Sequence, residues 1–137
     1  MDSPQSAAFS YPDNKKLILL VEDDEVHASM LYQVLKEETP YHIYYASDGL
    51  DAWNFLQHMK PHLILLDYRL PRMDGLALYD KIHEHRDLQD LPVLMISAVL
   101  PLREIQQRGI ASIQKPFEID NLLQTIDMLI TSSSDVS

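Results

Sequence analysis

The segment HLILLD, residues 62–67, is an almost wholly apolar run that ends in one carboxylate. A continuous apolar run of this length, without alternating polar residues, is typical of a strand that helices cover on both faces. We therefore expect His62–Leu66 to form a central parallel strand, with Asp67 directly after it.

Four similar short segments lie on either side of this strand: Leu17–Val21, His42–Ala46, Pro92–Ser97 and Ala111–Gln114. Between them, apolar residues recur at helical spacing, most clearly in Glu118–Ile130. Regular alternation of strand and helix predicts an α/β fold. We expect a doubly wound five-stranded parallel sheet of order 2-1-3-4-5, with helices on both faces.

The other helices are expected at Asp24–Glu38 and in two shorter segments. Among the expected helices, only the one after Ser97 has a weak helical pattern of apolar residues. The apolar residues expected to face the sheet are Val26, Met30, Val34 and Leu35, then Leu50, Trp53 and Leu56, then Leu76, Tyr79 and Ile82.

The chain has 137 residues and is 46% hydrophobic, which suits one compact domain. We place that domain at residues 16–130. The polar ends, residues 1–15 and 131–137, are expected to be flexible tails.

The formal net charge is −10, from 21 acidic residues against 11 Lys and Arg. This charge argues against direct binding to nucleic acid or to an anionic membrane surface. There is no cysteine, so thiol chemistry is excluded. Neither a signal peptide nor a membrane-spanning segment is evident, so a cytoplasmic location is expected.

Polar side chains follow the predicted strands: Glu22 and Asp23 the first, Asp67 the third, Ser97 the fourth and Lys115 the fifth. The first and third strands are neighbours in the expected order, so their carboxylates should lie close together. A hard cation, Mg²⁺ or Mn²⁺, relieves the repulsion within such a cluster.

An ammonium and a hydroxyl group are suited to bind the oxygens of a transferred phosphoryl group, which assigns Lys115 and Ser97 to that task. Asp67 is then the candidate nucleophile. Each residue alone has an ordinary explanation as a helix cap, turn or loop residue. Their combination at one edge of the sheet favours phosphoryl chemistry.

Four segments carry a specific resemblance: LILLVEDD, HLILLDYRLPRMDG, LMISA and QKPF match, in order and spacing, the receiver domain of bacterial response regulators. The resemblance implies that Asp67 is the phosphoacceptor and that Ser97 and Lys115 bind the phosphoryl group. It also implies a cis Lys115-Pro116 peptide bond.

The same resemblance makes Asp23 a direct metal ligand, Glu22 a mostly water-mediated one and the Arg69 backbone carbonyl a further ligand. The implied partners are a sensor histidine kinase or phosphotransfer protein, which donates the phosphoryl group, and an unknown downstream protein. A small donor such as acetyl phosphate is also implied.

The sequence departs from the family in two places. Ser112 occupies the position of the usual aromatic residue, and the stretch from Ser97 to Lys115 is shorter by about four residues, or one helical turn. We therefore expect a short or irregular fourth helix, and we expect a monomer.

Tyr41, Tyr44 and Tyr45 are interpreted as packing residues of an edge strand.

Three functions stay open at this point. The first is a stand-alone regulator, relay shuttle or excised domain that is phosphorylated on Asp67. The second is a pseudo-receiver that only binds partners, against which the retained site residues argue. The third is a Mg²⁺-dependent aspartate-nucleophile phosphohydrolase, whose D-x-D pair and substrate cap we do not find.

Overall fold

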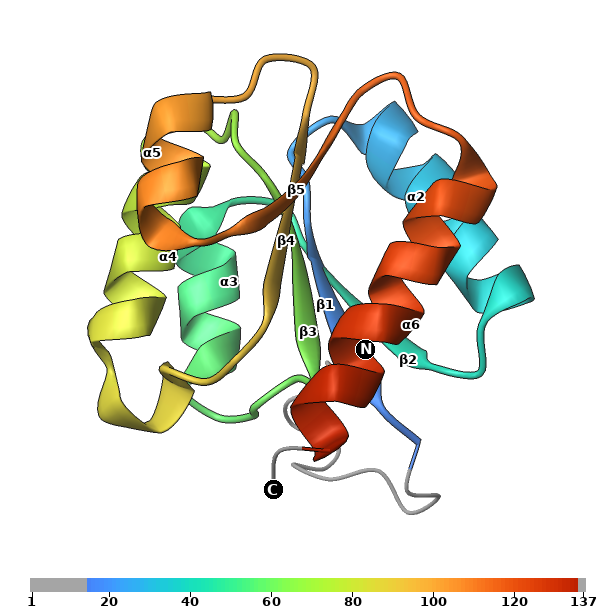
Figure 1. Cartoon of the computed structure of the whole chain (residues 1–137), viewed down its shortest axis with the longest axis horizontal. Coiled ribbons are helices and arrows are strands. Elements are labelled where there is room, and N and C mark those ends of the chain that lie inside the picture. Colours follow the sequence, from blue (N-terminus) through green and yellow to red (C-terminus); the bar gives the residue numbers. More distant parts are fainter. Residues whose placement is uncertain (1–14, 136–137) are drawn as a thin grey trace.

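The structure is a computed structural model and describes residues 15–135. These residues form a five-stranded parallel sheet of order β2-β1-β3-β4-β5, as the sequence predicts (Figure 1). The strands are β1 (Leu17–Val21), β2 (His42–Ala46), β3 (Leu63–Asp67), β4 (Val93–Ser97) and β5 (Ala111–Gln114). The helices are α2 (Glu25–Glu38), α3 (Gly49–Leu56), α4 (Gly75–Glu84), the 3-10 helix η1 (Arg86–Leu88), α5 (Leu102–Arg108) and α6 (Ile119–Asp135).

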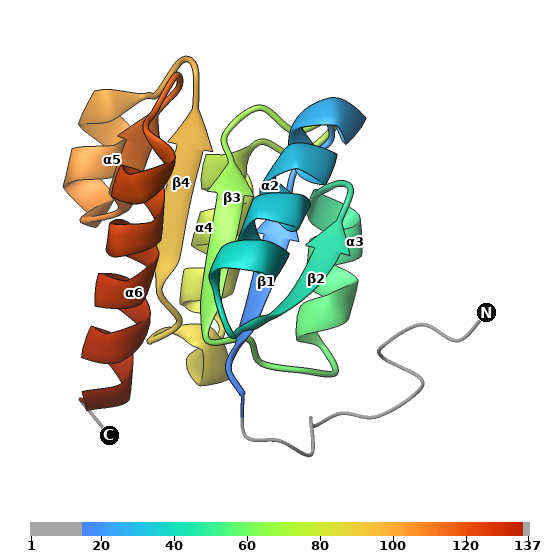
Figure 2. The same ribbon diagram turned by 90° about the vertical axis from the view of Figure 1, so that its right-hand side faces the viewer.

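Helices cover both faces of the sheet. Figures 1 and 2 show α3, α4 and α5 on one face and α2 and α6 on the other. All residues of β1, β3 and β4 are buried, whereas most of β2 is half-buried. The continuous apolar runs therefore do form the central strands, because both of their faces are removed from water.

Two elements end later than predicted, and β3 and β4 each begin one residue later, at Leu63 and Val93. Strand β3 ends at Asp67 and not at Leu66, since Asp67 still pairs with Ile96 of β4. Helix α6 continues to Asp135, so the predicted end at Ile130 is wrong and residues 131–135 are helical. Extending an existing helix costs far less free energy than starting one, so the helix can continue into a segment of Thr and Ser.

Apart from Lys15, the expected N-terminal tail (residues 1–15) lies outside the described residues, as do residues 136–137.

Part of the predicted apolar face of α2 is also wrong. Val26 is 76% exposed and Met30 is 47% exposed, whereas Ala28, Leu31 and Leu35 are buried. Apolar residues occupy more than one side of this helix, and its contact with the sheet decides which side is buried.

In α3, the predicted core residue Leu50 is exposed, whereas Phe55 is fully buried. Leu56 of α3 and Ile82 of α4 are buried as predicted.

Helix α5 is short, as predicted, with seven residues and a single buried side chain, Ile105. Pro101 precedes it without a side-chain cap, and Gly109 ends it in the left-handed conformation with φ +67°. Arg108 fixes the helix to α4 because its guanidinium donates two hydrogen bonds, of 2.8 and 2.9 Å, to the Asp80 carboxylate.

Candidate functional site

The predicted site residues meet at the carboxyl edge of the sheet. Glu22 and Asp23 directly follow β1, and Asp67 is the last residue of β3. One carboxylate oxygen from each of these three residues lies within 4.8 Å of the other two. Glu22 and Asp67 are buried and Asp23 is exposed, so the cluster lies at the surface with one open side.

Lys115 brings a positive charge to this cluster from beyond β5. Its Nζ lies 3.1 Å from Glu22 Oε1 and 3.6 Å from Asp67 Oδ2. The backbone amide of Lys115 donates a 2.9 Å hydrogen bond to the Ser97 carbonyl, which ties the loop after β5 to the end of β4. The Lys115-Pro116 peptide bond is cis, as the resemblance implied.

Burial and neighbouring charge perturb Glu22. Burial, followed by the hydrogen bond and the charge of Asp67, raises the pKa of Glu22 from 4.5 to about 7. The backbone amide of Asp24 and the Lys115 ammonium act in the opposite direction, because each donates a hydrogen bond to the Glu22 carboxylate. The raised pKa of Glu22 therefore reflects mainly its removal from water, and the nearby Asp67 carboxylate adds to it.

Backbone groups hold Asp67 and Asp24 in place. The amide of Arg69 donates a 2.8 Å hydrogen bond to Asp67 Oδ1. Asp24 caps α2 by accepting from the amides of Val26 and His27 at 2.9 and 3.1 Å. These bonds fix side chains directly after β1 and at the end of β3, where the acidic residues lie.

Gly75 allows the loop after β3 to pack against the site. Its amide donates a 2.8 Å hydrogen bond to the Tyr68 carbonyl. A Cβ atom added at Gly75 would lie 2.8 Å from the Asp67 carbonyl oxygen and 2.9 Å from Tyr68 Cα. Only glycine permits this approach of α4 to the backbone of Asp67.

Ser97 and Arg69 lie beside the cluster. Ser97 ends β4, is 2% exposed, and follows Ile96, the partner of Asp67 in the sheet. Arg69 is two residues beyond Asp67 and has an exposed side chain. Ser112 is half-buried in β5 and pairs with Met95 of β4. It therefore lies within the sheet and not at its carboxyl edge.

Sequence reasoning missed one residue at the rim of this site. Tyr45 was interpreted as a packing residue, and its ring does contact the core beneath α2 and α6. Its hydroxyl, however, donates a 2.7 Å hydrogen bond to the backbone carbonyl of Glu22. No pattern in the sequence indicates this bond: it follows from the parallel register of β1 and β2, which places Tyr45 opposite Leu20, two residues before Glu22.

The donor set fits a hard divalent cation. Oxygen ligands from three carboxylates are the kind that Mg²⁺ and Mn²⁺ prefer, and water can complete the coordination on the open side. The cluster and the adjacent ammonium also match what a phosphoryl group requires.

The doubly wound sheet, with a carboxylate cluster and a lysine at its carboxyl edge, defines a receiver-type signalling domain. The family model of the response regulator receiver domain matches residues 18–127, and the chain belongs to this family of two-component signalling domains. None of the helices within residues 15–135 has the length and apolar character needed to span a bilayer.

Curated relatives agree with this assignment. The chain is similar to the response regulator Rcp1 of Synechocystis sp., with 38% identity over 90 residues, which cover 60% of this chain and 61% of Rcp1. The chain thus spans about three fifths of that relative's own length. It is also similar to the polar-differentiation response regulator DivK of Brucella anthropi, with 30% identity over 115 residues, 81% of this chain and 93% of DivK.

Among solved structures, the chain is similar to the receiver domain of the sensor histidine kinase PA1611 from Pseudomonas aeruginosa. That crystal structure has a magnesium ion coordinated in the active-site cleft. The TM-score is 0.77 with 26% identity, over 85% of this chain and 98% of the PA1611 domain.

Proposed function

We propose that the domain accepts a phosphoryl group on Asp67 from a phosphohistidine of a sensor histidine kinase or phosphotransfer protein. Phosphorylation then changes how the domain contacts a downstream protein. One observation carries the proposal: Lys115 Nζ lies 3.6 Å from Asp67 Oδ2, beside three carboxylates whose oxygens lie within 4.8 Å of one another. The candidate nucleophile Asp67, the cation-binding carboxylates and the ammonium that would pair with phosphate thus lie next to one another.

The side chains of Glu22, Asp23 and Asp67 and the Arg69 carbonyl would hold Mg²⁺, or Mn²⁺ in its place. When bound, the ion neutralises the carboxylates and the charge that develops on the phosphoryl oxygens. The magnesium ion in the PA1611 receiver domain supports this assignment.

The residues of the chain have separate tasks in the transfer. An oxygen of Asp67 forms the new bond to phosphorus as the bond from phosphorus to the donor histidine nitrogen breaks, and that nitrogen keeps the electron pair. The Arg69 amide orients Asp67 through its hydrogen bond to Oδ1. The Lys115 ammonium and the Ser97 hydroxyl bind phosphoryl oxygens and stabilise their charge.

The direct test is incubation of the protein with acetyl phosphate and Mg²⁺, followed by intact-mass measurement. We expect a single phosphoryl adduct that is stable in acid and labile in base. Asp67→Asn abolishes it, whereas Asp90→Asn, at an exposed loop residue between η1 and β4, does not. An adduct that survives Asp67→Asn contradicts the assignment of the nucleophile.

The same experiment separates the alternatives. Release of phosphate without any adduct would favour the aspartate-nucleophile phosphohydrolase. Absence of both adduct and turnover, with acetyl phosphate and with phosphorylated histidine donors, would favour the pseudo-receiver.

A further inference from the structure

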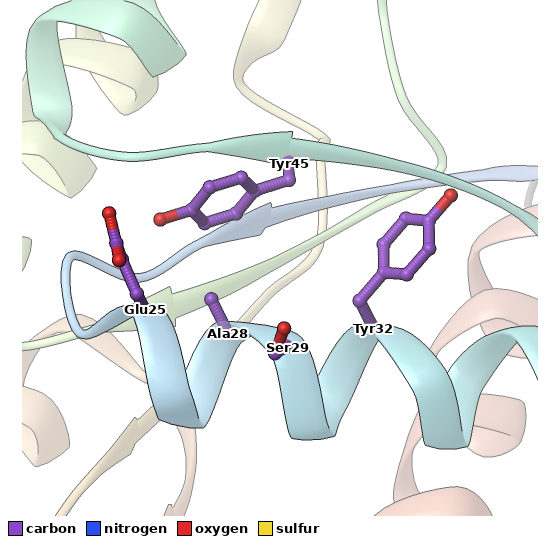
Figure 3. A pocket seen from close by; sticks show the side chains of 5 residues that line it. All are labelled: Glu25, Ala28, Ser29, Tyr32 and Tyr45. Carbon is purple, nitrogen blue, oxygen red and sulfur yellow. The ribbon is translucent and has the colours of Figure 1, made fainter.

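Tyr45 connects the edge strand β2 to the acidic loop after β1. It lies opposite Leu20 in the sheet, and its ring lies on the face that α2 and α6 cover. Figure 3 shows the ring between β2 and α2, with the hydroxyl directed toward the Glu25 end of the helix. That hydroxyl donates a 2.7 Å hydrogen bond to the Glu22 carbonyl.

Packing against the core supports the Tyr45 ring on one side only. One side of the ring borders a cavity of about 420 Å³, which is also lined by Glu25, Ala28, Ser29 and Tyr32 (Figure 3). A ring with open space beside it can turn, because no atoms oppose the movement on that side. The hydrogen bond to Glu22 is therefore the contact that fixes the hydroxyl.

The loop that Tyr45 holds carries two of the three clustered carboxylates. Its residues Glu22, Asp23 and Asp24 are consecutive acids that repel one another. Strand β2 holds the Glu22 backbone twice, through the Ala46 carbonyl, which accepts from the Glu22 amide at 3.2 Å, and through the Tyr45 hydroxyl. Asp23 is exposed, so its position depends on the backbone of its neighbours.

We propose that Tyr45 is a positioning residue for the cation site: its hydroxyl fixes the Glu22 carbonyl, and thereby the loop that presents the Glu22 and Asp23 carboxylates. The inference rests on the proposed function, since it concerns the cation that assists phosphorylation of Asp67. Groups that orient metal ligands without touching the metal commonly change affinity about 10- to 100-fold when removed. Tyr45 acts through a backbone carbonyl, so the lower end of this range applies.

The test is Tyr45→Phe, which removes the hydroxyl and keeps the ring. We expect the Mg²⁺ dissociation constant, from amide shifts of residues 22–24 in an NMR titration, to rise about tenfold. With acetyl phosphate as donor, the Mg²⁺ concentration for half-maximal phosphorylation should rise by the same factor. The rate at saturating Mg²⁺ should stay within about twofold of the wild-type rate, because bound cation restores the loop.

Tyr41→Phe is the matched control. The Tyr41 hydroxyl donates a hydrogen bond of the same length, 2.7 Å, to Asp127, and Tyr41 directly precedes β2, whereas Tyr45 lies near the other end of the strand. This variant should lose stability without a change in Mg²⁺ affinity. Equal Mg²⁺ affinity in Tyr45→Phe and wild type, or equal losses of affinity in the two variants, would overturn the inference.

These outcomes are distinct from failure of the proposed function. If the wild-type protein itself binds no Mg²⁺ and forms no adduct, the function fails and Tyr45 has no cation to position. If the wild type binds Mg²⁺ and is phosphorylated while Tyr45→Phe behaves identically, only the role of Tyr45 is wrong.

Discussion

The ammonium of Lys115 lies 3.1 Å from Glu22 Oε1, although the two residues are 93 positions apart in the sequence. They follow strands β5 and β1, which are separated in the sheet by β3 and β4. The Lys115 side chain is 18% exposed and that of Glu22 is 3% exposed, so water screens the pair weakly. The pair places a positive charge beside Asp67 before any phosphoryl group arrives.

Replacing this lysine should separate cation binding from phosphorylation. In Lys115→Met the charge partner of the phosphoryl oxygens is lost, and we expect the rate of phosphorylation by acetyl phosphate to fall about 100-fold. Mg²⁺ binding should persist, since the carboxylates remain. Lys81→Met, at an exposed lysine whose Nζ lies 4.9 Å from the centre of the Trp53 ring, is the control and should keep the wild-type rate. A wild-type rate in Lys115→Met would refute the role of the ammonium.

The raised pKa of Glu22, about 7, predicts a pH-dependent stability in the absence of divalent cations. A carboxyl group with a raised pKa binds its proton more tightly in the folded protein than in the unfolded one. The resulting stabilisation is complete below the ordinary pKa of 4.5 and is lost as the pH rises through about 7. Urea denaturation in EDTA should show the free energy of unfolding falling by on the order of 2 kcal/mol from acidic to slightly alkaline pH.

Two variants assign this pH dependence to its source. Glu22→Gln cannot ionise, so its free energy of unfolding should lose this decrease. Glu25→Gln, at an exposed acid in the first turn of α2, should retain it. If Glu22→Gln follows the wild-type curve, another group is responsible.

Gly75→Ala should disturb the site through the backbone. The new Cβ would lie 2.8 Å from the Asp67 carbonyl oxygen, so the backbone must shift, and we expect a loss of about 1–3 kcal/mol of stability. The displaced Asp67 should also be phosphorylated more slowly, which intact-mass time courses measure.

Gly109→Ala provides the comparison for Gly75. Within residues 15–135, no atom beyond the two chain neighbours lies within 4 Å of a Cβ added there, but φ is +67°, so the cost of about 1 kcal/mol comes from the left-handed backbone alone. Phosphorylation should proceed at the wild-type rate in this variant. An equal decrease of the rate in both variants would mean that general destabilisation, and not displacement of Asp67, is the cause.

The ion pair of Arg108 and Asp80 should control the mobility of α5. Only Ile105 of this helix is buried, so the two hydrogen bonds to α4 are a large share of its anchoring. Arg108→Lys keeps the charge but cannot form both bonds, and amide hydrogen exchange in residues 102–108 should accelerate. Arg103→Lys, at an exposed position of the same helix, should leave exchange unchanged. Unchanged exchange in Arg108→Lys would show that other contacts hold α5.

The helix faces show where local reasoning fails. The apolar spacing in α2 predicted that Val26 and Met30 face the sheet, yet both are exposed and the smaller Ala28 is buried. A helix with apolar residues on several sides has no unique inner face until it packs. Contact with β1 and β2 then decides which side is buried, and Ala28, Leu31 and Leu35 lie on that side.

The sequence alone determined the strands, their order and the residues at the carboxyl edge, because apolar runs and chain connectivity are local or topological properties. Asp67, Asp23 and Lys115 could be placed together on that basis. Only the tertiary structure decided the contacts between side chains, such as the Tyr45 hydroxyl on the Glu22 carbonyl, and the raised pKa of Glu22. Those depend on distances of a few ångströms and on exclusion of water, which arise only after distant segments have packed against one another.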